Sequence, residues 1–232
     1  MGDQYPDEVT VYLVTLDIYT QFLYAIDSVT LTVGASDSAF YQFDEVPTGF
    51  YLTKAALVES SQYYDDYIPT YYGEKIFWAR ANFIPLFTDR EEIDIQLIEA
   101  ENPGGPGFIS GNIFEGAGKN DPGAEDVQLI LLDEEANAIA YTFSDENGYF
   151  EFDNIPYGNY TVYGESINKE ADPVPAAVDE NNPQATDVGM EIQESLITGL
   201  REDIDQYLTS IGEVYPNPVT GVARLEVELR NT

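Results

Sequence analysis

Carboxylate oxygens are the main chemical resource of this sequence. Its 232 residues include 43 Asp and Glu against 9 Lys and Arg, a formal net charge of −34, and no His or Cys. Without imidazole or thiol groups, a Ser/His/Asp or Cys/His nucleophile, a disulfide framework and a zinc finger are all excluded. Nucleic acid and anionic membranes are disfavoured as partners because both require a basic surface. Cations, neutral sugars and other proteins remain.

Aromatic side chains form the second chemical feature. Seven Tyr, Phe and Trp residues crowd into residues 63–78. Flat rings beside carboxylates can stack on sugars, so Tyr71, Tyr72 and Trp78 are candidates for binding a glycan. The favoured alternative is packing, because Tyr and Trp anchor a long connection by burying area while keeping a polar tip.

No pair of carboxylates stands out as the acid and base of a glycoside hydrolase, although 43 acidic residues are available. We therefore predict no catalytic residues and no enzymatic activity. No apolar run approaches the roughly 20 residues needed to cross a bilayer, so membrane insertion is not expected either. The first residues also lack the basic and apolar regions of a signal peptide.

Strand patterns dominate the elements that would position these residues. Short runs rich in β-branched and aromatic residues alternate with Gly, Pro, Asp and Ser. We expect strands at residues 9–17, 21–32, 40–46, 50–58, 92–99, 108–114, 127–132, 138–143, 149–155, 159–165 and 186–192. Strands at this spacing indicate antiparallel β-sandwiches. The fold class is therefore predicted to be all-β.

The two halves of the chain share one hairpin pattern. FYQFDEVPTGFYLTKA, from Phe40, aligns with YFEFDNIPYGNYTVYG, from Tyr149, at a constant offset of 109 residues (149 − 40). The coinciding positions include Pro47 and Pro156, Gly49 and Gly158, and Tyr51 and Tyr160. A Pro that fixes φ and a Gly that permits positive φ suit a turn between two strands. We interpret the chain as a tandem repeat of one β-domain.

The second half resembles the carboxypeptidase regulatory-like, or transthyretin-like, β-sandwich domains, which are related to the B-type repeats of bacterial adhesins. Their signature combines T-x-x-D-x-x-G-x-[FY]-x-F with a P-x-G-x-Y hairpin. The matching residues are Thr142, Asp145, Gly148, Tyr149 or Phe150, Phe152, Pro156, Gly158 and Tyr160. The first half keeps the hairpin but has SDSA where the second has DENG. The resemblance implies two tandem Greek-key (transthyretin/Ig-like) sandwiches without catalytic function.

The end of the chain resembles the start of the C-terminal sorting domain of the type IX secretion system of Bacteroidota. Tyr215, Pro216, Asn217 and Pro218 match its YPNP element, and an alternating strand follows. The resemblance implies a secreted or surface-attached protein in which only the first strand of this domain is present. A simple turn before an edge strand is the alternative.

These patterns predict five regions. They are a first β-sandwich at 1–100 with an aromatic insertion at 59–90, a Gly/Pro linker at 101–107, a second β-sandwich at 108–193, an acidic linker at 194–213, and the truncated sorting domain at 214–232. In the acidic linker, apolar residues from Ile197 to Ile211 recur at intervals of 3 and 4, which favours a helix. Gly199 favours an extended linker instead.

In a sandwich of this type, the loops at 119–126 and 144–148 lie at the same end. That placement would gather five oxygen-bearing side chains, namely Asp121, Glu125, Asp126, Asp145 and Asn147. An all-oxygen set suits Ca²⁺, although the spacing is not that of an EF-hand, and Ca²⁺ is the one cofactor considered. A solvated acidic loop is the alternative.

The predicted function is a non-catalytic, extracellular structural or adhesive module at the cell surface, serving as a stalk or a filament subunit. Its partners would be its own copies or other surface proteins. In a filament, the terminal strand would add to a sheet of the next subunit through Arg224, Leu225, Val227 and Leu229. A carbohydrate-binding module of a secreted enzyme is the alternative. Some related adhesin domains carry an internal Lys–Asn bond, which we do not expect because no lysine lies on a first strand.

Overall fold

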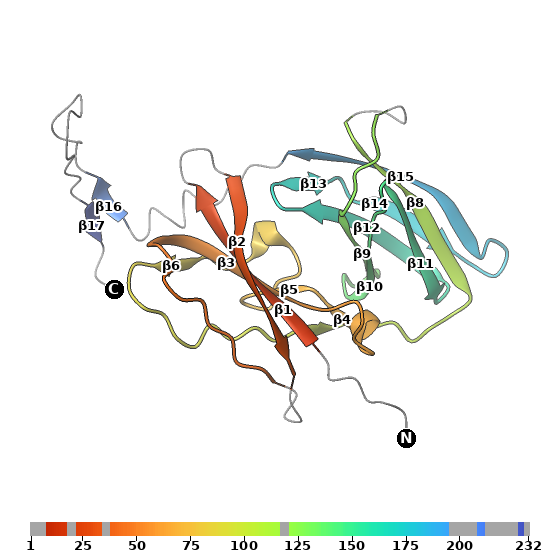
Figure 1. The fold of residues 1–232 in the computed structure, drawn as a ribbon. Coiled ribbons are helices and arrows are strands. Elements are labelled where there is room, and N and C mark those ends of the chain that lie inside the picture. Colours follow the sequence, from red (N-terminus) through yellow and green to blue (C-terminus); the bar gives the residue numbers. More distant parts are fainter. Residues whose placement is uncertain are drawn as a thin grey trace, which may run out of the picture. The chain divides into compact units, whose positions relative to one another are not determined.

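The computed structural model describes residues 8–17, 22–33, 38–116 and 121–194, together with the backbone of 208–211 and 227–229. Over this part of the chain, the regular structure is almost entirely β (Figure 1). Its helical elements are two single 3-10 turns, η1 (Tyr64–Asp66) and η2 (Trp78–Arg80). Within these residues no helix has the length and apolar character that a membrane crossing requires. The predicted all-β sandwich class is confirmed.

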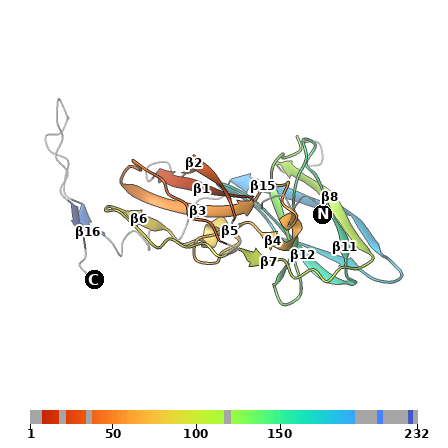
Figure 2. The same cartoon turned by 60° about the horizontal axis from the view of Figure 1, so that its bottom comes forward.

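The strands before residue 100 form what we call the N-lobe. Its main sheet has the order β2-β1-β3-β5, with β6 also paired to β3. These strands are β1 (Glu8–Asp17), β2 (Phe22–Thr32), β3 (Gly49–Leu57), β5 (Thr70–Tyr71) and β6 (Ile84–Leu86). A separate short pair, β4 (Tyr67–Ile68) and β7 (Ile98–Glu99), lies side by side in Figure 2.

Two expected strands of the N-lobe do not form as predicted. Residues 40–46 form no ladder, and of 92–99 only Ile98 and Glu99 form a strand, so the strand predictions are wrong there. The period-two alternation still decides which side chains face inward. Tyr41, Phe43, Ile95 and Leu97 pack against the sheet core of Val9, Val11, Ala55 and Leu57. Hydrophobic alternation fixes which face a residue points to but does not specify a hydrogen-bonding neighbour.

The strands between residues 107 and 194 form the C-lobe. They belong to one hydrogen-bonded sheet of order β10-β9-β12-β13-β15-β8-β11, with β14 also paired to β12. The strands are β8 (Gly107–Glu115), β9 (Gln128–Leu132), β10 (Ala138–Phe143), β11 (Tyr149–Ile155), β12 (Gly158–Ser166), β13 (Lys169–Ala171), β14 (Val174–Val178) and β15 (Gln184–Glu194). Because short β13 pairs with both β12 and β15, the sheet folds over into two layers.

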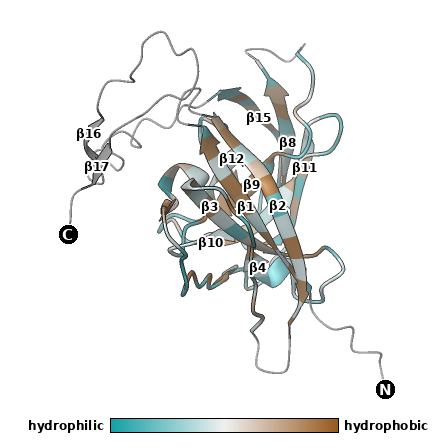
Figure 3. Ribbon diagram, turned by 60° about the vertical axis from the view of Figure 1, so that its left-hand side comes forward, coloured by the Kyte–Doolittle hydropathy of each residue, from teal (hydrophilic) through white to brown (hydrophobic). Residues whose placement is uncertain are grey.

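The core of the C-lobe lies between these two layers. β8, β11 and β15 contribute Ile109, Ile113, Phe150, Phe152, Val188, Met190 and Ile192 from one side, and β9, β10 and β12 contribute Leu129, Leu131, Ile139, Tyr160 and Val162 from the other. Hydrophobic and polar segments alternate along the strands of both lobes (Figure 3). The alternation is what a half-buried strand requires.

The C-terminal segment holds one further pair of strands. β16 (Leu208–Ile211) pairs antiparallel with β17 (Val227–Leu229). The helix expected at 194–213 is therefore wrong at Leu208–Ile211, where strand pairing overrides the helical period. Residues 195–207, 212 and 213, and the YPNP motif with Arg224 and Leu225, lie outside the described residues. In the described strands, Val227 and Leu229 pair within their own chain, and their role between subunits stays a prediction.

The repeated P-x-G-x-Y element forms no paired hairpin in either lobe, so that prediction is wrong. Residues 40–46 form no ladder, and β11 pairs with β8 while β12 pairs with β9, β13 and β14. The element nevertheless makes the same contact in both lobes. The Tyr51 hydroxyl donates to the carbonyl of Pro47 at 2.5 Å, and the Tyr160 hydroxyl donates to the carbonyl of Pro156 at 2.8 Å. Both tyrosines are buried. This arrangement is a tyrosine corner, in which a buried ring pins a strand to the backbone just upstream. The 109-residue offset in the sequence therefore repeats a contact as well as a pattern.

Replacing Tyr160 by Phe should lower the free energy of unfolding by about 1 kcal/mol, because one buried hydrogen bond is lost while the ring stays. The measurement is urea denaturation followed by circular dichroism. Tyr157→Phe is the matched control, since Tyr157 is 42% exposed. Equal losses in both variants would show that the corner contributes nothing specific.

Candidate functional site

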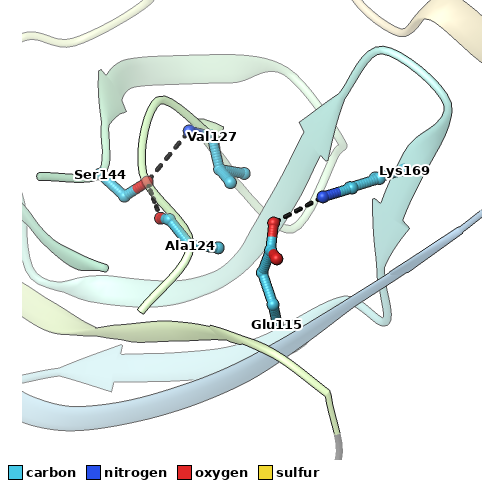
Figure 4. A network of polar contacts seen from close by, with 5 residues as sticks. All are labelled: Glu115, Ala124, Val127, Ser144 and Lys169. Carbon is cyan, nitrogen blue, oxygen red and sulfur yellow. Dashed lines mark hydrogen bonds and ion pairs between the residues drawn. The ribbon is translucent and has the colours of Figure 1, made fainter. Parts of the chain in front are cut away.

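The acidic loops expected to bind Ca²⁺ do meet at one end of the C-lobe. The Ser144 hydroxyl donates to the carbonyl of Ala124 at 2.6 Å and accepts from the amide of Val127 at 3.0 Å (Figure 4). Gly148 has a φ of +73°, and a Cβ there would lie 2.1 Å from the carbonyl oxygen of Ile113. The loops are thus fastened by backbone and hydroxyl contacts that need no ion.

Their carboxylates do not converge. Within the described residues, no three acidic side chains are grouped so that they could hold a metal ion. One oxygen of Asp145 instead accepts the backbone amides of Asn147 and Tyr149, each at 2.8 Å. An Asp that caps its own turn in this way explains the D-x-x-G signature structurally. Calcium binding by Asp121, Glu125, Asp126, Asp145 and Asn147 stays an untested prediction.

Replacing Asp145 by Ala should lower the free energy of unfolding by about 1–2 kcal/mol, because two backbone amides lose their acceptor. Asp145→Asn should retain most of that stability, since an amide oxygen can accept the same bonds. We expect melting temperatures to be equal in CaCl₂ and in EDTA. A Ca²⁺-dependent rise that Asp145→Asn abolishes would instead assign the carboxylate to a metal site.

The proposed glycan-binding face is not a surface. Trp78 is 1% exposed and Tyr71 2%, so neither ring can stack on a sugar, and only Tyr72 is partly exposed. The glycan prediction for Tyr71 and Trp78 is therefore wrong. The aromatic insertion lies against the C-lobe and buries its rings there. Sequence composition cannot separate an aromatic binding face from an aromatic interface, because both use the same residues.

The junction between the two lobes combines a buried apolar cluster with buried polar groups, and it is the main candidate site among the described residues. The outer face of β9 and β10, which points away from the C-lobe core, contacts side chains from the aromatic insertion of the N-lobe. Ile68 and Phe77 cluster with Ile130, Ala138 and Tyr141, and all five are buried. The Phe77 ring also lies 4.2 Å from that of Tyr163 on β12, measured between ring centroids. The β9–β12 pair is consequently covered on both of its faces.

Polar groups are enclosed at the edge of this apolar contact. The Lys54 amine of β3 donates to the side-chain oxygen of Gln128 on β9 at 2.6 Å. Glu165 of β12 lies directly opposite Gln128 in the antiparallel ladder. Gln128 is 2% exposed and Glu165 is 1% exposed, while Lys54 is partly buried. Glu165 also accepts the backbone amide of Trp78 at 3.1 Å.

Burial changes the protonation of this cluster. Desolvation raises the pKa of Glu165 to about 8, against the lowering effects of the Lys54 charge and the Trp78 amide. Desolvation likewise lowers the pKa of Lys54, opposed by the Glu165 charge. The two shifts have the same cause, since both groups are more easily buried without charge. Burial therefore favours the protonated, uncharged form of Glu165.

Three further hydrogen-bonded contacts hold the lobes together. The side-chain amide of Asn168 accepts from the backbone amide of Leu23 at 2.7 Å and donates to its carbonyl at 2.8 Å. The Tyr141 hydroxyl donates to the carbonyl of Tyr64 at 2.9 Å. The Trp78 indole also donates to the carbonyl of Lys169 at 3.3 Å. These contacts come from different parts of the N-lobe.

Reasoning from the sequence did not identify Lys54, Gln128 or Glu165. In the alternation of β12, Glu165 falls on the face expected to meet solvent, together with Tyr163. One signal was present, because VQLILL at 127–132 contains an apolar run without alternation. Such a run is typical of a strand buried on both faces. It identifies the covered strand but not the residues that cover it.

One comparison with known proteins concerns the C-lobe. Residues 106–187 match a family model described as BOS complex subunit NOMO1-like, second beta sandwich domain. A 46-residue stretch is 44% identical to serine-aspartate repeat-containing protein F of Staphylococcus epidermidis strain ATCC 12228, over 20% of this chain and 3% of that protein. The same identity and length relate it to a fibrinogen-binding protein of S. epidermidis, of which 4% is covered. This chain thus spans a few per cent of those relatives.

Similar solved structures include pilin subunits. The major pilin BcpA of Bacillus cereus has 15% identity and a TM-score of 0.32, with 83% of this chain and 61% of that chain covered. The minor pilin GBS52 of Streptococcus agalactiae has 13% identity and a TM-score of 0.32, with 82% and 84% covered.

Replacing Trp78 by Ala should lower the free energy of unfolding by about 3–5 kcal/mol, because a fully buried ring leaves a cavity at the junction. Phe40→Ala is the control, since Phe40 is 83% exposed. Urea denaturation followed by tyrosine fluorescence and circular dichroism measures both variants. A Trp78 variant as stable as the parent would contradict the structural role of this ring.

Proposed function

We propose that this chain is a non-catalytic structural or adhesive module of an extracellular cell-surface protein, in which two β-sandwich lobes act as one stiff stalk segment. The observation that carries the proposal is the junction. A linkage that buries Trp78, Ile130 and Glu165 between lobes suits transmission of force, because the lobes cannot reorient without exposing these groups. The similarity of a short stretch to a fibrinogen-binding protein of Staphylococcus epidermidis supports an extracellular location.

The remaining sequence predictions belong to this proposal. The division into sandwiches at 1–100 and 108–193 accords with a stalk built from repeated modules. The YPNP motif at 215–218 supports export through the type IX route of Bacteroidota. Assembly with further copies of itself would make the protein a filament subunit.

An antibody raised against the purified protein should label intact cells of the producing organism before they are permeabilised. Immunogold electron microscopy then separates the two forms of the proposal. Gold particles aligned along fibres would indicate a filament subunit, and scattered particles on the cell surface would indicate a stalk. Labelling that requires permeabilisation would refute the surface location.

A further inference from the structure

An amine, a primary amide and a carboxylic acid meet inside the junction. The Lys54 nitrogen lies 2.6 Å from the Gln128 side-chain oxygen. Since a C=O bond measures about 1.23 Å, the amide carbon lies within about 3.8 Å of that nitrogen. This distance is close to the separation of about 3–3.5 Å at which a nucleophile and the carbon it attacks are positioned to react.

Two other polar atoms of the cluster have no hydrogen-bond partner among the described residues. The Gln128 side-chain nitrogen and one Glu165 carboxyl oxygen are buried and make no hydrogen bond within the described part of the chain. Leaving such groups unsatisfied is unfavourable, so each needs an explanation. Cross-strand neighbours on one face have Cβ atoms about 4.5–5.5 Å apart, which places these two side chains together.

The surroundings favour uncharged forms of the reactants. Desolvation lowers the pKa of the Lys54 amine and raises that of the Glu165 carboxyl to about 8. A neutral amine is the nucleophilic form of lysine, and a desolvated lysine is the usual way proteins obtain it. The Tyr71 ring, whose centroid lies 5.0 Å from the Lys54 nitrogen, closes one side of the cluster.

We propose that Lys54 and Gln128 join in an amide bond that links the N-lobe to the C-lobe, with Glu165 relaying the proton. A bond forms between the Lys54 nitrogen and the Gln128 side-chain carbon, and the bond from that carbon to the amide nitrogen breaks. Glu165, in its protonated form, donates its proton to the departing nitrogen, which leaves as ammonia, and the resulting carboxylate takes up the proton that the attacking amine loses. No oxidant, metal or other co-reactant is required.

This bond differs from the Lys–Asn bond considered from the sequence, which would lie within one domain. Here the two reacting residues lie 74 positions apart, on β3 and β9 of different lobes. A covalent link between them would close the intervening chain, including the Gly/Pro linker, into a loop. Closing a loop restricts the unfolded chain and so stabilises the folded one. The reaction is a self-modification and does not depend on the proposed surface location.

The test is the intact mass of the purified full-length protein after complete denaturation. We expect a mass lower than that of the sequence by one ammonia molecule. Tryptic digestion should then yield a joined peptide pair containing an uncleaved Lys54 and Gln128, because trypsin does not cut after an acylated lysine. If the folded, unsubstituted protein has the full mass calculated from its sequence, the proposal is wrong, and no variant is needed to show it.

Variants identify the source of the lost ammonia. Lys54→Arg and Gln128→Ala should each restore the full mass, whereas Lys75→Arg, at an exposed lysine, should leave the parent mass unchanged. Glu165→Gln should fold, as judged by circular dichroism, yet accumulate the bond at least tenfold more slowly. Loss of ammonia that persists in Lys54→Arg, for instance from ring closure at Asn147–Gly148, would refute the bond.

Discussion

The outer face of the β9–β12 pair must be kept from water, and this requirement governs the arrangement of both lobes. Ile130 on that face is fully buried, and Glu165 is 1% exposed. Neither is covered by the core of the C-lobe, which lies on the opposite face of the same strands. The N-lobe provides the cover through Ile68, Phe77 and Trp78. The aromatic insertion is thus the means by which one sandwich completes the other.

The charged residues at this junction are unexpected in a chain with so few cations. A chain with a net charge of −34 has few cations to distribute, and most of its acids lie on exposed strand positions and turns. One of its four lysines nevertheless lies at the junction, and one of its acids is buried there. Burying an amine and an acid is unfavourable compared with an apolar contact of the same size. Their presence there calls for a role other than stability, and reaction with Gln128 provides one.

The sequence predicted the strands better than the surfaces on which they meet. The pattern at 127–165 predicted β9 to β12 because alternation and turn residues are local properties. The repeated P-x-G-x-Y element predicted a hairpin, which neither copy forms, but both copies form a tyrosine corner. The unpaired run at 40–46 and the buried state of Trp78 could not be predicted, because both depend on contacts between residues distant in the chain. Glu165 was missed for the same reason, since its alternation indicates solvent until another lobe covers it.

Composition alone presents residues 101–107 as a flexible Gly/Pro connection, which would allow the lobes to move independently. The contacts argue otherwise, because the lobes also meet at Leu23 with Asn168 and at Lys54 with Gln128. These contacts lie far apart in the chain, and each limits rotation about the others. Separating the lobes would therefore break them together and expose the apolar cluster around Ile130 in the same step. Coupling of this kind lets a load pass from sheet to sheet, so the peptide linker need not carry it.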